Sequence, residues 1–313
     1  MIIPIPGRDD IAAAAERIAG HVRLTPTLLL ADDVGFSAGA VTLKLDLLQP
    51  TGSFKVRGAF SRLLAQNPRP DRVVAASGGN FGLAVAYAAR TLGIAADVFV
   101  PETSPAAKID RLRGEGAEVH VIPGHYADAL AASESWLDDH DALFAHAYDQ
   151  FDVVAGQGTC GREMAQQIPG ADTVLVAVGG GGLIGGIAAW YQGDARVVGV
   201  ETVGTPTLHT ARDRGGPVDV EVGGAALSSL GSRRLGDIAW EVSTRWIDDS
   251  LLVTDEATTA AQRWLWDTCR LIAEPGAATP IAALMSGVYR PESDEHVAVL
   301  VCGANVDPGS VAS

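Results

Sequence analysis

A run of four glycines between a strand-like and a helix-like segment constrains the fold of this chain more than any other feature. Residues 173–178 are apolar and β-branched over the length of a strand, residues 179–182 are all glycine, and residues 183–190 suit a helix. Backbone N–H groups in such a loop can converge on an anion, and glycine avoids a Cβ clash with it. The loop has neither the spaced G-x-G-x-x-G of dinucleotide-binding proteins nor the Lys-Ser/Thr ending of a P-loop. We therefore predict a phosphate site made by backbone groups alone.

Strand-like and helix-like segments alternate through most of the chain, which is typical of parallel sheets wrapped by helices. Loops follow strand-like runs after Ala76, Val178 and Val301, and in open α/β sheets such strand ends carry the ligand site. The predicted fold class is therefore α/β, with these loops at one shared site. The predicted strands are residues 72–76, 96–100, 118–122, 173–178, 196–201 and 297–302, and the predicted helices are residues 56–64, 82–92, 105–114, 127–138 and 183–190.

Lys55 stands at the start of a predicted helix, directly after a turn-forming stretch that contains Pro50 and Gly52. A cation is disfavoured at the positive end of a helix dipole, so the pKa of this amine should be lowered. A neutral lysine can act as a nucleophile or form a Schiff base. The segment alone does not exclude an ordinary solvated lysine. A reactive lysine together with a separate phosphate loop, however, indicates pyridoxal 5′-phosphate (PLP) as a cofactor.

Composition and charge disfavour several classes of function. The 313 residues, 47% of them hydrophobic, suffice for one large or two modest domains with a substantial core. The net charge of −15 argues against binding to nucleic acids and to anionic membranes. We recognise no signal peptide and no apolar run of membrane-spanning length, so we expect a cytoplasmic protein. Three widely spaced cysteines and seven histidines show no disulfide framework and no metal-ligand spacing.

Four sequence blocks resemble, in the same order, those of the fold-type II PLP-dependent enzymes, specifically the serine/threonine dehydratase and serine racemase branch. They are residues 51–59, 76–80, 179–183 and 301–307. Any one block would be a weak signal, but the four together are specific, and further stretches extend the resemblance over nearly the whole chain.

The resemblance implies two parallel-sheet α/β domains of the tryptophan synthase β type, with the cofactor in the cleft between them. Residues 48–147 would form the small domain, and residues 1–47 plus 148–313 the large PLP-binding domain. Family analogy also favours a homodimer. The small residues of the predicted helix at 182–189 could pack either inside the protein or at a dimer face.

The resemblance also assigns roles to individual residues. Lys55 would hold PLP as a Schiff base and, once substrate displaces it, remove the Cα proton. Cys302 would face the pyridine nitrogen, and because a thiol is a weak donor the nitrogen would stay largely neutral, which suits β-elimination and not transamination. Phe54 would pack on the cofactor ring, and Asn80 would bond its phenolic oxygen. Backbone N–H groups of Gly179, Gly180, Gly181, Gly182 and Leu183 would bind the phosphate, and the segment of Ser77, Gly78, Gly79 and Asn80 would bind the substrate carboxylate.

Some positions depart from the family pattern. Racemases carry a proton-donating serine where this chain has Gly78, which predicts elimination with little or no racemisation. Phe81 replaces a common histidine, and residues 223–227 replace an Ala-Asp-Gly pattern near the cofactor, so the substrate side chain stays open. Glu201 matches a carboxylate that binds a divalent cation in several relatives, but residues 202–208 contain no second acid, so we predict no metal site.

The expected function is that of an L-threonine/L-serine dehydratase (ammonia-lyase), which converts an amino acid substrate into a 2-oxo acid and ammonia. Alternatives in the family are β-elimination or replacement on a hydroxyaspartate, diaminopropionate or O-activated serine, and serine racemisation. An acidic β-substituent would require a basic pocket residue, which the sequence does not locate. A non-catalytic metabolite-binding protein is disfavoured because Lys55 is present, and a nucleotide-binding protein would leave Lys55 and Cys302 unexplained.

Overall fold

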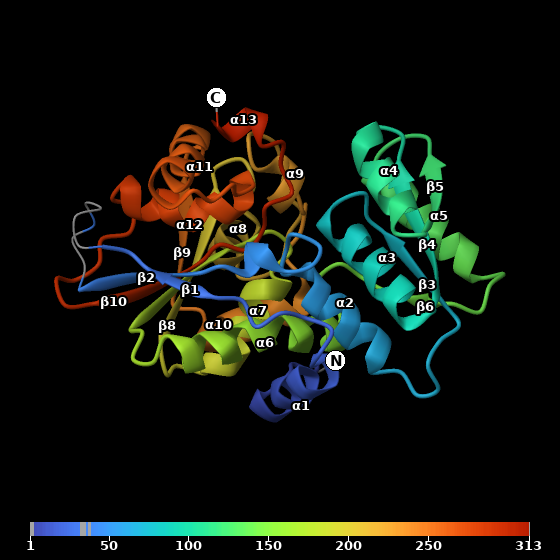
Figure 1. The fold of residues 1–313 in the computed structure, drawn as a ribbon, viewed down its shortest axis with the longest axis horizontal. Helices are drawn as coiled ribbons and strands as arrows, with labels where there is room; N and C mark the ends of the chain where they lie inside the picture. Colours follow the sequence, from blue (N-terminus) through green and yellow to red (C-terminus); the bar gives the residue numbers. More distant parts are fainter. Residues whose placement is uncertain (1–2, 32–35, 37–38, 313) are drawn as a thin grey trace.

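The computed structural model describes residues 3–31, 36 and 39–312 and places them in two lobes, each with its own β-sheet (Figure 1). The larger sheet contains β1 (Thr27–Leu29), β2 (Ala40–Lys44), β7 (Thr173–Ala177), β8 (Arg196–Thr202), β9 (Asp249–Val253) and β10 (His296–Leu300). Its strand order is β1–β2–β10–β7–β8–β9, and every neighbouring pair is parallel except β1 and β2.

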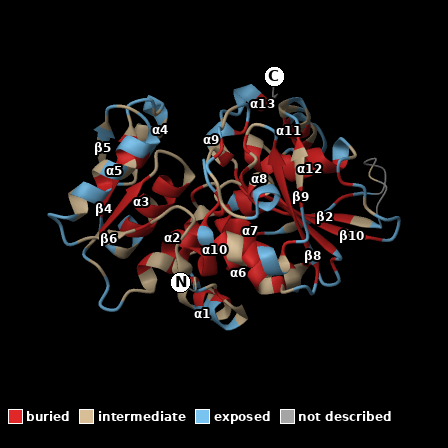
Figure 2. Ribbon diagram, turned by 180° about the vertical axis from the view of Figure 1, so that it is seen from behind, coloured by how far each residue is buried: buried red, intermediate tan, exposed pale blue. Residues whose placement is uncertain are grey.

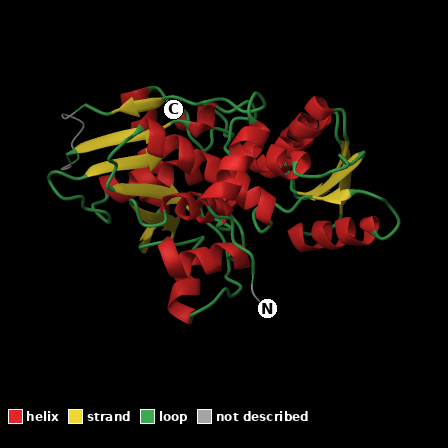
Figure 3. Cartoon of the chain, turned by 90° about the horizontal axis from the view of Figure 1, so that it is seen from below, coloured by secondary structure: helices red, strands yellow, loops and turns green. Residues whose placement is uncertain are grey.

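The smaller sheet is fully parallel, with the order β5–β4–β3–β6. Its strands are β3 (Arg72–Ala76), β4 (Ala95–Pro101), β5 (Glu118–Ile122) and β6 (Leu143–Phe144). Figure 3 shows the two groups of strands at opposite ends of the molecule, with helices between them. The predicted fold class is confirmed, apart from the antiparallel edge strand β1 of the larger sheet. The small-domain limits of 48 and 147 enclose the smaller sheet and remain a prediction.

Helices cover both sheets, and α2 (Lys55–Leu64) contacts helices of both lobes. The smaller sheet packs against α3 (Asn80–Leu92), α4 (Ala106–Gly114) and α5 (Tyr126–Leu137). In the described part of the chain, every helix is too short or too polar to cross a membrane. The other helices are α1 (Arg8–Ile18), α6 (Phe151–Gln167), α7 (Gly182–Tyr191), α8 (Thr207–Arg214), α9 (Leu227–Leu230), α10 (Asp237–Trp246), α11 (Asp255–Cys269), α12 (Pro275–Met285) and α13 (Gly309–Ala312), with a short 3-10 helix at Asp46–Leu48.

The central strands β7 and β10 are largely apolar, as expected for strands with helices on both faces. All five residues of β7 are buried, as are four of the five in β10. Figure 2 shows that buried residues follow the strands and the helix faces packed against them. Parallel strands buried on both faces read as continuous hydrophobic runs, which is the pattern that located them in the sequence.

The predicted strands and helices all occur, with ends within two residues of the prediction. Several further elements were not predicted, among them β2, β9 and the longest helix, α6. Its 17 residues include Gly156, Gly158 and Gly161, and glycine costs a helix about 1 kcal/mol per residue relative to alanine. Close packing against neighbouring helices explains these glycines. A Cβ at Gly156 would lie 2.6 Å from the Cβ of Ser61 in α2, whereas Gly158 and Gly161 face α7. A Cβ at Gly158 would lie 2.8 Å from the carbonyl oxygen of Gly186, and a Cβ at Gly186 would overlap the backbone of α6. The small residues of α7 therefore pack inside the protein.

A cluster of buried charges fastens α2 to the larger lobe. The fully buried Arg57 guanidinium donates to both carboxylate oxygens of Asp46, at 2.8 and 2.7 Å, and to those of Glu163, at 2.7 and 2.8 Å. Lys44, also buried, donates to Glu163 at 2.8 Å. Burial opposes ionisation of Asp46, but the charge and hydrogen bonds of Arg57 outweigh it and lower the pKa of this carboxyl group. The charges of Arg57 and Asp46 are thus stable only as a pair.

Replacing the central cation tests this cluster. Arg57→Met should lower the free energy of unfolding by about 3–5 kcal/mol, because it leaves the Asp46 carboxylate buried without its partner. Arg62→Ala is the control, since Arg62 forms a partly exposed ion pair with Asp152 at 3.0 Å whose loss should cost at most about 1 kcal/mol. Urea denaturation measures both values. Equal losses would contradict a special role for the buried pair.

Candidate active site

Lys55 is the first residue of α2, and the backbone before it is joined to the end of the larger sheet. Gly52 turns the chain with a φ of +73°, a conformation that side chains disfavour. The N–H of Phe54 donates to the carbonyl of Cys302 at 3.0 Å, and the N–H of Ala304 donates to that of Gly52 at 2.8 Å. The blocks that carry Lys55 and Cys302, far apart in sequence, are therefore paired through their backbones.

The Lys55 amine is partly buried beside two aromatic rings. Its Nζ donates to the carbonyl of Ala147 at 2.8 Å and lies 5.1 and 5.6 Å from the ring centroids of Phe54 and Phe81. Burial lowers the pKa of this amine to about 8. The sequence predicted this direction from the helix dipole, whereas the structure attributes it to desolvation. A lysine with such a pKa is partly neutral, and so nucleophilic, near neutral pH.

The glycine loop between β7 and α7 uses its carbonyl groups but not its N–H groups. The carbonyls of Gly180 and Gly181 accept backbone hydrogen bonds at 3.0 and 2.8 Å. The N–H groups of residues 179–182 donate to no acceptor among the residues that the structure describes. They lie at the start of a helix, where the dipole favours an anion. A phosphate group would satisfy these donors.

Glycine is required in this loop because the neighbouring backbone and side chains approach it closely. A Cβ at Gly182 would lie 2.6 Å from the carbonyl oxygen of Tyr148, and one at Gly180 would overlap the Tyr148 ring. Gly181 has a φ of +87°, which disfavours any side chain. Tyr148 follows Ala147, the acceptor for Lys55. The reactive lysine and the loop of N–H donors therefore contact the same short segment of chain.

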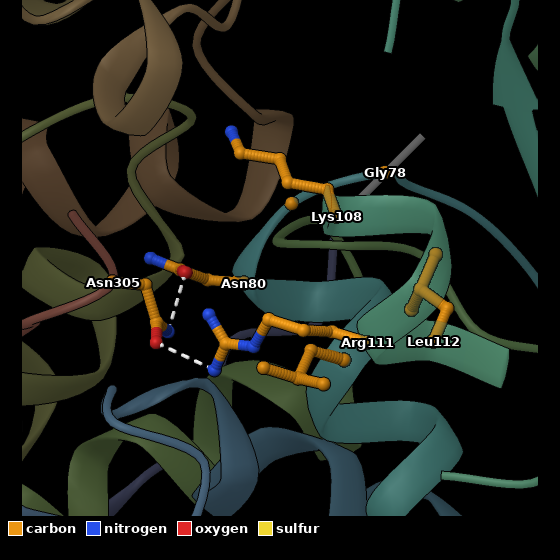
Figure 4. Close-up of a pocket in the computed structure, with 8 residues that line it drawn as sticks. Gly78, Asn80, Lys108, Arg111, Leu112 and Asn305 are labelled. Atoms are coloured by element: carbon orange, nitrogen blue, oxygen red, sulfur yellow. Dashed lines mark hydrogen bonds between the residues drawn. The ribbon is translucent and has the colours of Figure 1, made fainter. Parts of the chain in front are cut away.

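The segment at residues 77–80 reaches the site from the smaller lobe. Asn80 begins α3, donates to both oxygens of Glu274 at 2.8 and 2.9 Å, and accepts from the Asn305 amide at 2.8 Å. Figure 4 shows Asn80 and Asn305 facing each other. The 76–80 and 301–307 blocks are thus in contact, as expected for a shared site. A contact between Asn80 and the cofactor would compete with these bonds and remains a prediction.

Three of the four residues in the predicted substrate-binding segment line a pocket. Gly78, Gly79 and Asn80 line a pocket with an empty volume of about 280 Å³. Ser77 is not among the lining residues, and its hydroxyl accepts a long hydrogen bond of 3.4 Å from the N–H of Gly79. Gly78 and Gly79 are thus open to a ligand in this pocket, and the substrate-binding role of residues 77–80 stays a prediction.

Glu274 is a candidate functional residue to which the sequence analysis assigned no role. It is buried at the start of α12, and a Cβ at Gly303 would overlap its carboxylate. Burial raises the pKa of Glu274, while the hydrogen bond from Asn80 opposes that rise. The charge of Glu274 in turn raises the pKa of Lys55 and so limits the effect of burial there. In the sequence, Glu274 could have been recognised as a single acidic residue directly before Pro275 in an otherwise apolar stretch.

Cys302 supplies a neutral group to the same site. Its side chain is buried, and burial raises the pKa of the thiol, an effect that the nearby Glu274 charge reinforces. The thiol therefore stays protonated over the physiological pH range. This agrees with the predicted weak interaction of Cys302 with a ring nitrogen, which stays a prediction.

The carboxylate of Glu201 is satisfied by protein groups. Burial raises its pKa to about 7, although its hydrogen bonds oppose the rise. A metal ion would have to compete with these donors, and the predicted absence of a metal remains a prediction. The donors are the Thr207 hydroxyl at 3.0 Å, the N–H groups of Leu208 and His209 at 2.8 Å each, and the Ser250 hydroxyl at 3.1 Å.

An amine able to form a Schiff base, close to a loop of unused N–H donors between two α/β lobes, fits pyridoxal phosphate. The loop at residues 179–182 would hold the phosphate, and Lys55 would hold the aldehyde carbon. The family described as pyridoxal-phosphate dependent enzyme matches residues 18–303. The chain belongs to this family, and its cofactor is pyridoxal phosphate.

Individual relatives lie close to the chain in sequence and in fold. Phenylserine dehydratase from Ralstonia pickettii is 34% identical over 313 residues, which cover 98% of this chain and 96% of that protein. The crystal structure of the T.th. threonine deaminase has a TM-score of 0.90 and 32% identity, covering 96% of this chain and 99% of that one. The structure of maize serine racemase has a TM-score of 0.92 and 27% identity, covering 98% and 96%. The predicted family, fold and cofactor are confirmed, while the roles of single residues remain predictions.

The lowered pKa of Lys55 predicts how cofactor binding depends on pH. The rate at which the apoprotein binds pyridoxal phosphate should rise with pH around a midpoint of about 8, because only the neutral amine attacks the aldehyde. Stopped-flow absorption across neutral and alkaline pH measures this rate, with Lys55→Ala as the blank. A rate that keeps rising up to the pKa of an ordinary lysine would contradict the prediction.

A methyl group in the glycine loop should weaken cofactor binding. Gly180→Ala places a Cβ against the Tyr148 ring, and such overpacking costs about 1–3 kcal/mol, so the dissociation constant should rise about tenfold or more. Titration of the visible absorption band gives the constant. Gly216→Ala is the control, since no atom lies within 4 Å of the added Cβ. An unchanged constant for Gly180→Ala would remove this loop from the cofactor site.

Proposed function

We propose that this protein is a PLP-dependent ammonia-lyase that dehydrates L-threonine and L-serine to 2-oxo acids. The proposal rests above all on the Lys55 amine, which is partly buried between Phe54 and Phe81, donates to the Ala147 carbonyl, and has its pKa lowered to about 8 by burial. Such an amine can both hold the cofactor and accept a proton near neutral pH. The relatives support the reaction type, because two of the three described above are named as a dehydratase and a deaminase.

The residues of the site divide the work of the reaction. Bound pyridoxal phosphate supplies an electron sink that acidifies the Cα proton of an amino acid. Gly78 and Gly79 hold the substrate carboxylate with their N–H groups at the start of α3. Lys55 in its neutral form would accept the Cα proton. The β-hydroxyl then leaves as water, and the enamine product tautomerises and hydrolyses to a 2-oxo acid and ammonia.

The site favours elimination over racemisation because it offers no second proton donor at position 78. Gly78 has no side chain. Ser104 has a hydroxyl group near Gly78, but it is not among the residues that line the pocket. The protonated thiol of Cys302 also limits the stabilisation of negative charge on the cofactor ring. The first feature removes a proton donor from the opposite face of Cα, and the second shortens the time in which a proton could return there.

Three further properties complete the proposal. The protein acts as a homodimer in the cytoplasm and binds no nucleic acid. The net charge of −15 supports the last of these. The homodimer follows the family pattern, and size-exclusion chromatography with light scattering would test it.

The reaction is tested by product analysis with two variants of the lysine. The holoenzyme should form 2-oxobutyrate from L-threonine and pyruvate from L-serine, each with one ammonia. Lys55→Ala should lower turnover by at least about 10²–10⁴-fold, as expected for a lost general base, and should abolish the visible band. Lys55→Arg keeps the positive charge and should fail equally.

Two outcomes would contradict the proposal in different ways. A cofactor band without oxo acid from either amino acid would retain the cofactor and reject the substrates. D-serine formed from L-serine at a rate comparable to pyruvate would show that a proton reaches the second face of Cα, against the argument from Gly78.

A further inference from the structure

A pocket at the mouth of the site joins the proposed carboxylate-binding segment to α4 of the smaller lobe (Figure 4). Gly78, Gly79 and Asn80 line it from one element, and Lys108 and Arg111 line it from α4. Residues three positions apart share a helix face, so α4 presents two cations to one pocket. The other lining residues are Leu83, Leu112 and Asn305.

Arg111 is held in place by a neutral partner. Its Nη2 donates to Oδ1 of Asn305 at 2.9 Å, and the Asn305 amide donates to Asn80 and to the carbonyl of Thr51, at 2.8 and 2.9 Å. Within the described residues Arg111 forms no salt bridge, whereas Arg113 on the same helix lies 3.7 Å from Asp110. The guanidinium of Arg111 thus keeps donors that suit a carboxylate.

Lys108 is the inner cation of the pair. Its ammonium makes no hydrogen bond or salt bridge with any residue that the structure describes, and its charge acts on the buried Glu274 carboxylate. Part of the Lys108 charge is therefore balanced by Glu274. Arg111, at the solvent-exposed rim, is the cation that the surrounding protein leaves unbalanced.

The α-carboxylate of a substrate does not account for both cations. Backbone N–H groups of Gly78 and Gly79, at the start of the 13-residue helix α3, already suit that group. The whole chain carries a net charge of −15, so two cations facing one pocket mark the place where its field favours an anion. A second acidic group on the substrate is the ligand that these positions fit.

We propose that the pocket selects 3-hydroxy amino acids with a second carboxylate on the β-carbon, and that Arg111, assisted by Lys108, binds this carboxylate. The inference rests on the proposed function and adds to L-threonine and L-serine a preferred acidic substrate for the same reaction. The basic residue that the sequence alone did not locate for an acidic β-substituent is thus provided by α4.

The reaction balances without an oxidant or reductant. Lys55 removes the Cα proton, the bond from the β-carbon to the hydroxyl breaks, and one water leaves. The enamine tautomerises to an imine, which takes up one water and releases ammonia. For 3-hydroxyaspartate the products are oxaloacetate and ammonia. The β-carboxylate takes no part in bond breaking, so Arg111 and Lys108 act in binding and specificity.

Binding of two non-reacting amino acids tests the charge preference directly. L-Aspartate and L-asparagine have nearly the same shape, differ in charge, and carry no hydroxyl leaving group. Titration of the holoenzyme, followed by the change in cofactor absorption, should show about tenfold tighter binding of L-aspartate. Arg111→Gln should bring the ratio of the two dissociation constants close to one. Arg113→Gln removes a charge from the same helix outside the pocket and should leave the ratio unchanged.

Turnover separates this inference from the proposed function. The holoenzyme should have a higher kcat/KM for 3-hydroxyaspartate than for L-threonine, and Arg111→Gln should reverse that order. Equal binding of L-aspartate and L-asparagine, or an equal loss of both in Arg111→Gln, would overturn the inference while leaving L-threonine and L-serine dehydration intact. Absence of oxo acid from all three hydroxy amino acids would instead overturn the proposed function.

Discussion

The site depends on the backbone pairing between the segment before Lys55 and the segment around Cys302. Two hydrogen bonds, from Phe54 to Cys302 and from Ala304 to Gly52, fix the start of α2 against the end of the larger sheet. Arg57 lies two residues after Lys55, and its guanidinium donates hydrogen bonds to Asp46 and Glu163 in the larger lobe. The amine is therefore anchored from both sides, and its low pKa follows from where this anchoring buries it.

The glycines at residues 179–182 allow other chain segments to approach this loop closely. Carbonyl groups of residues 180 and 181 are bonded to the protein, which leaves the opposite N–H groups of the loop available to an anion. Glycine also lets α6 and α7 pack backbone to backbone, because Gly158 and Gly186 have no side chains to separate the two helices. The close packing around the loop and its exposed N–H groups thus both depend on the absence of side chains.

Chemistry and specificity come from different lobes. Cys302 and Glu274, which lie close enough to Lys55 to affect its pKa, belong to the larger lobe. The cations that we assign to substrate selection, Lys108 and Arg111, lie on α4 beside the smaller sheet. Asn80 and Asn305 connect the two sets by hydrogen bonds across the cleft. Changes on α4 can therefore alter the preferred substrate without moving the reactive amine.

The sequence by itself determined the alternation of strands and helices, the glycine loop after β7, and Lys55 at a helix start, because each is a local pattern of a few residues. It also placed the blocks at strand ends, where parallel sheets bring them together. Only the tertiary structure revealed α6, because its glycines disfavour a helix locally and are explained by close contact with α2 and α7. It also revealed Glu274 and Arg111 as site residues. Each bonds a partner 194 positions away, Asn80 and Asn305 respectively, and no local pattern encodes a contact of that separation.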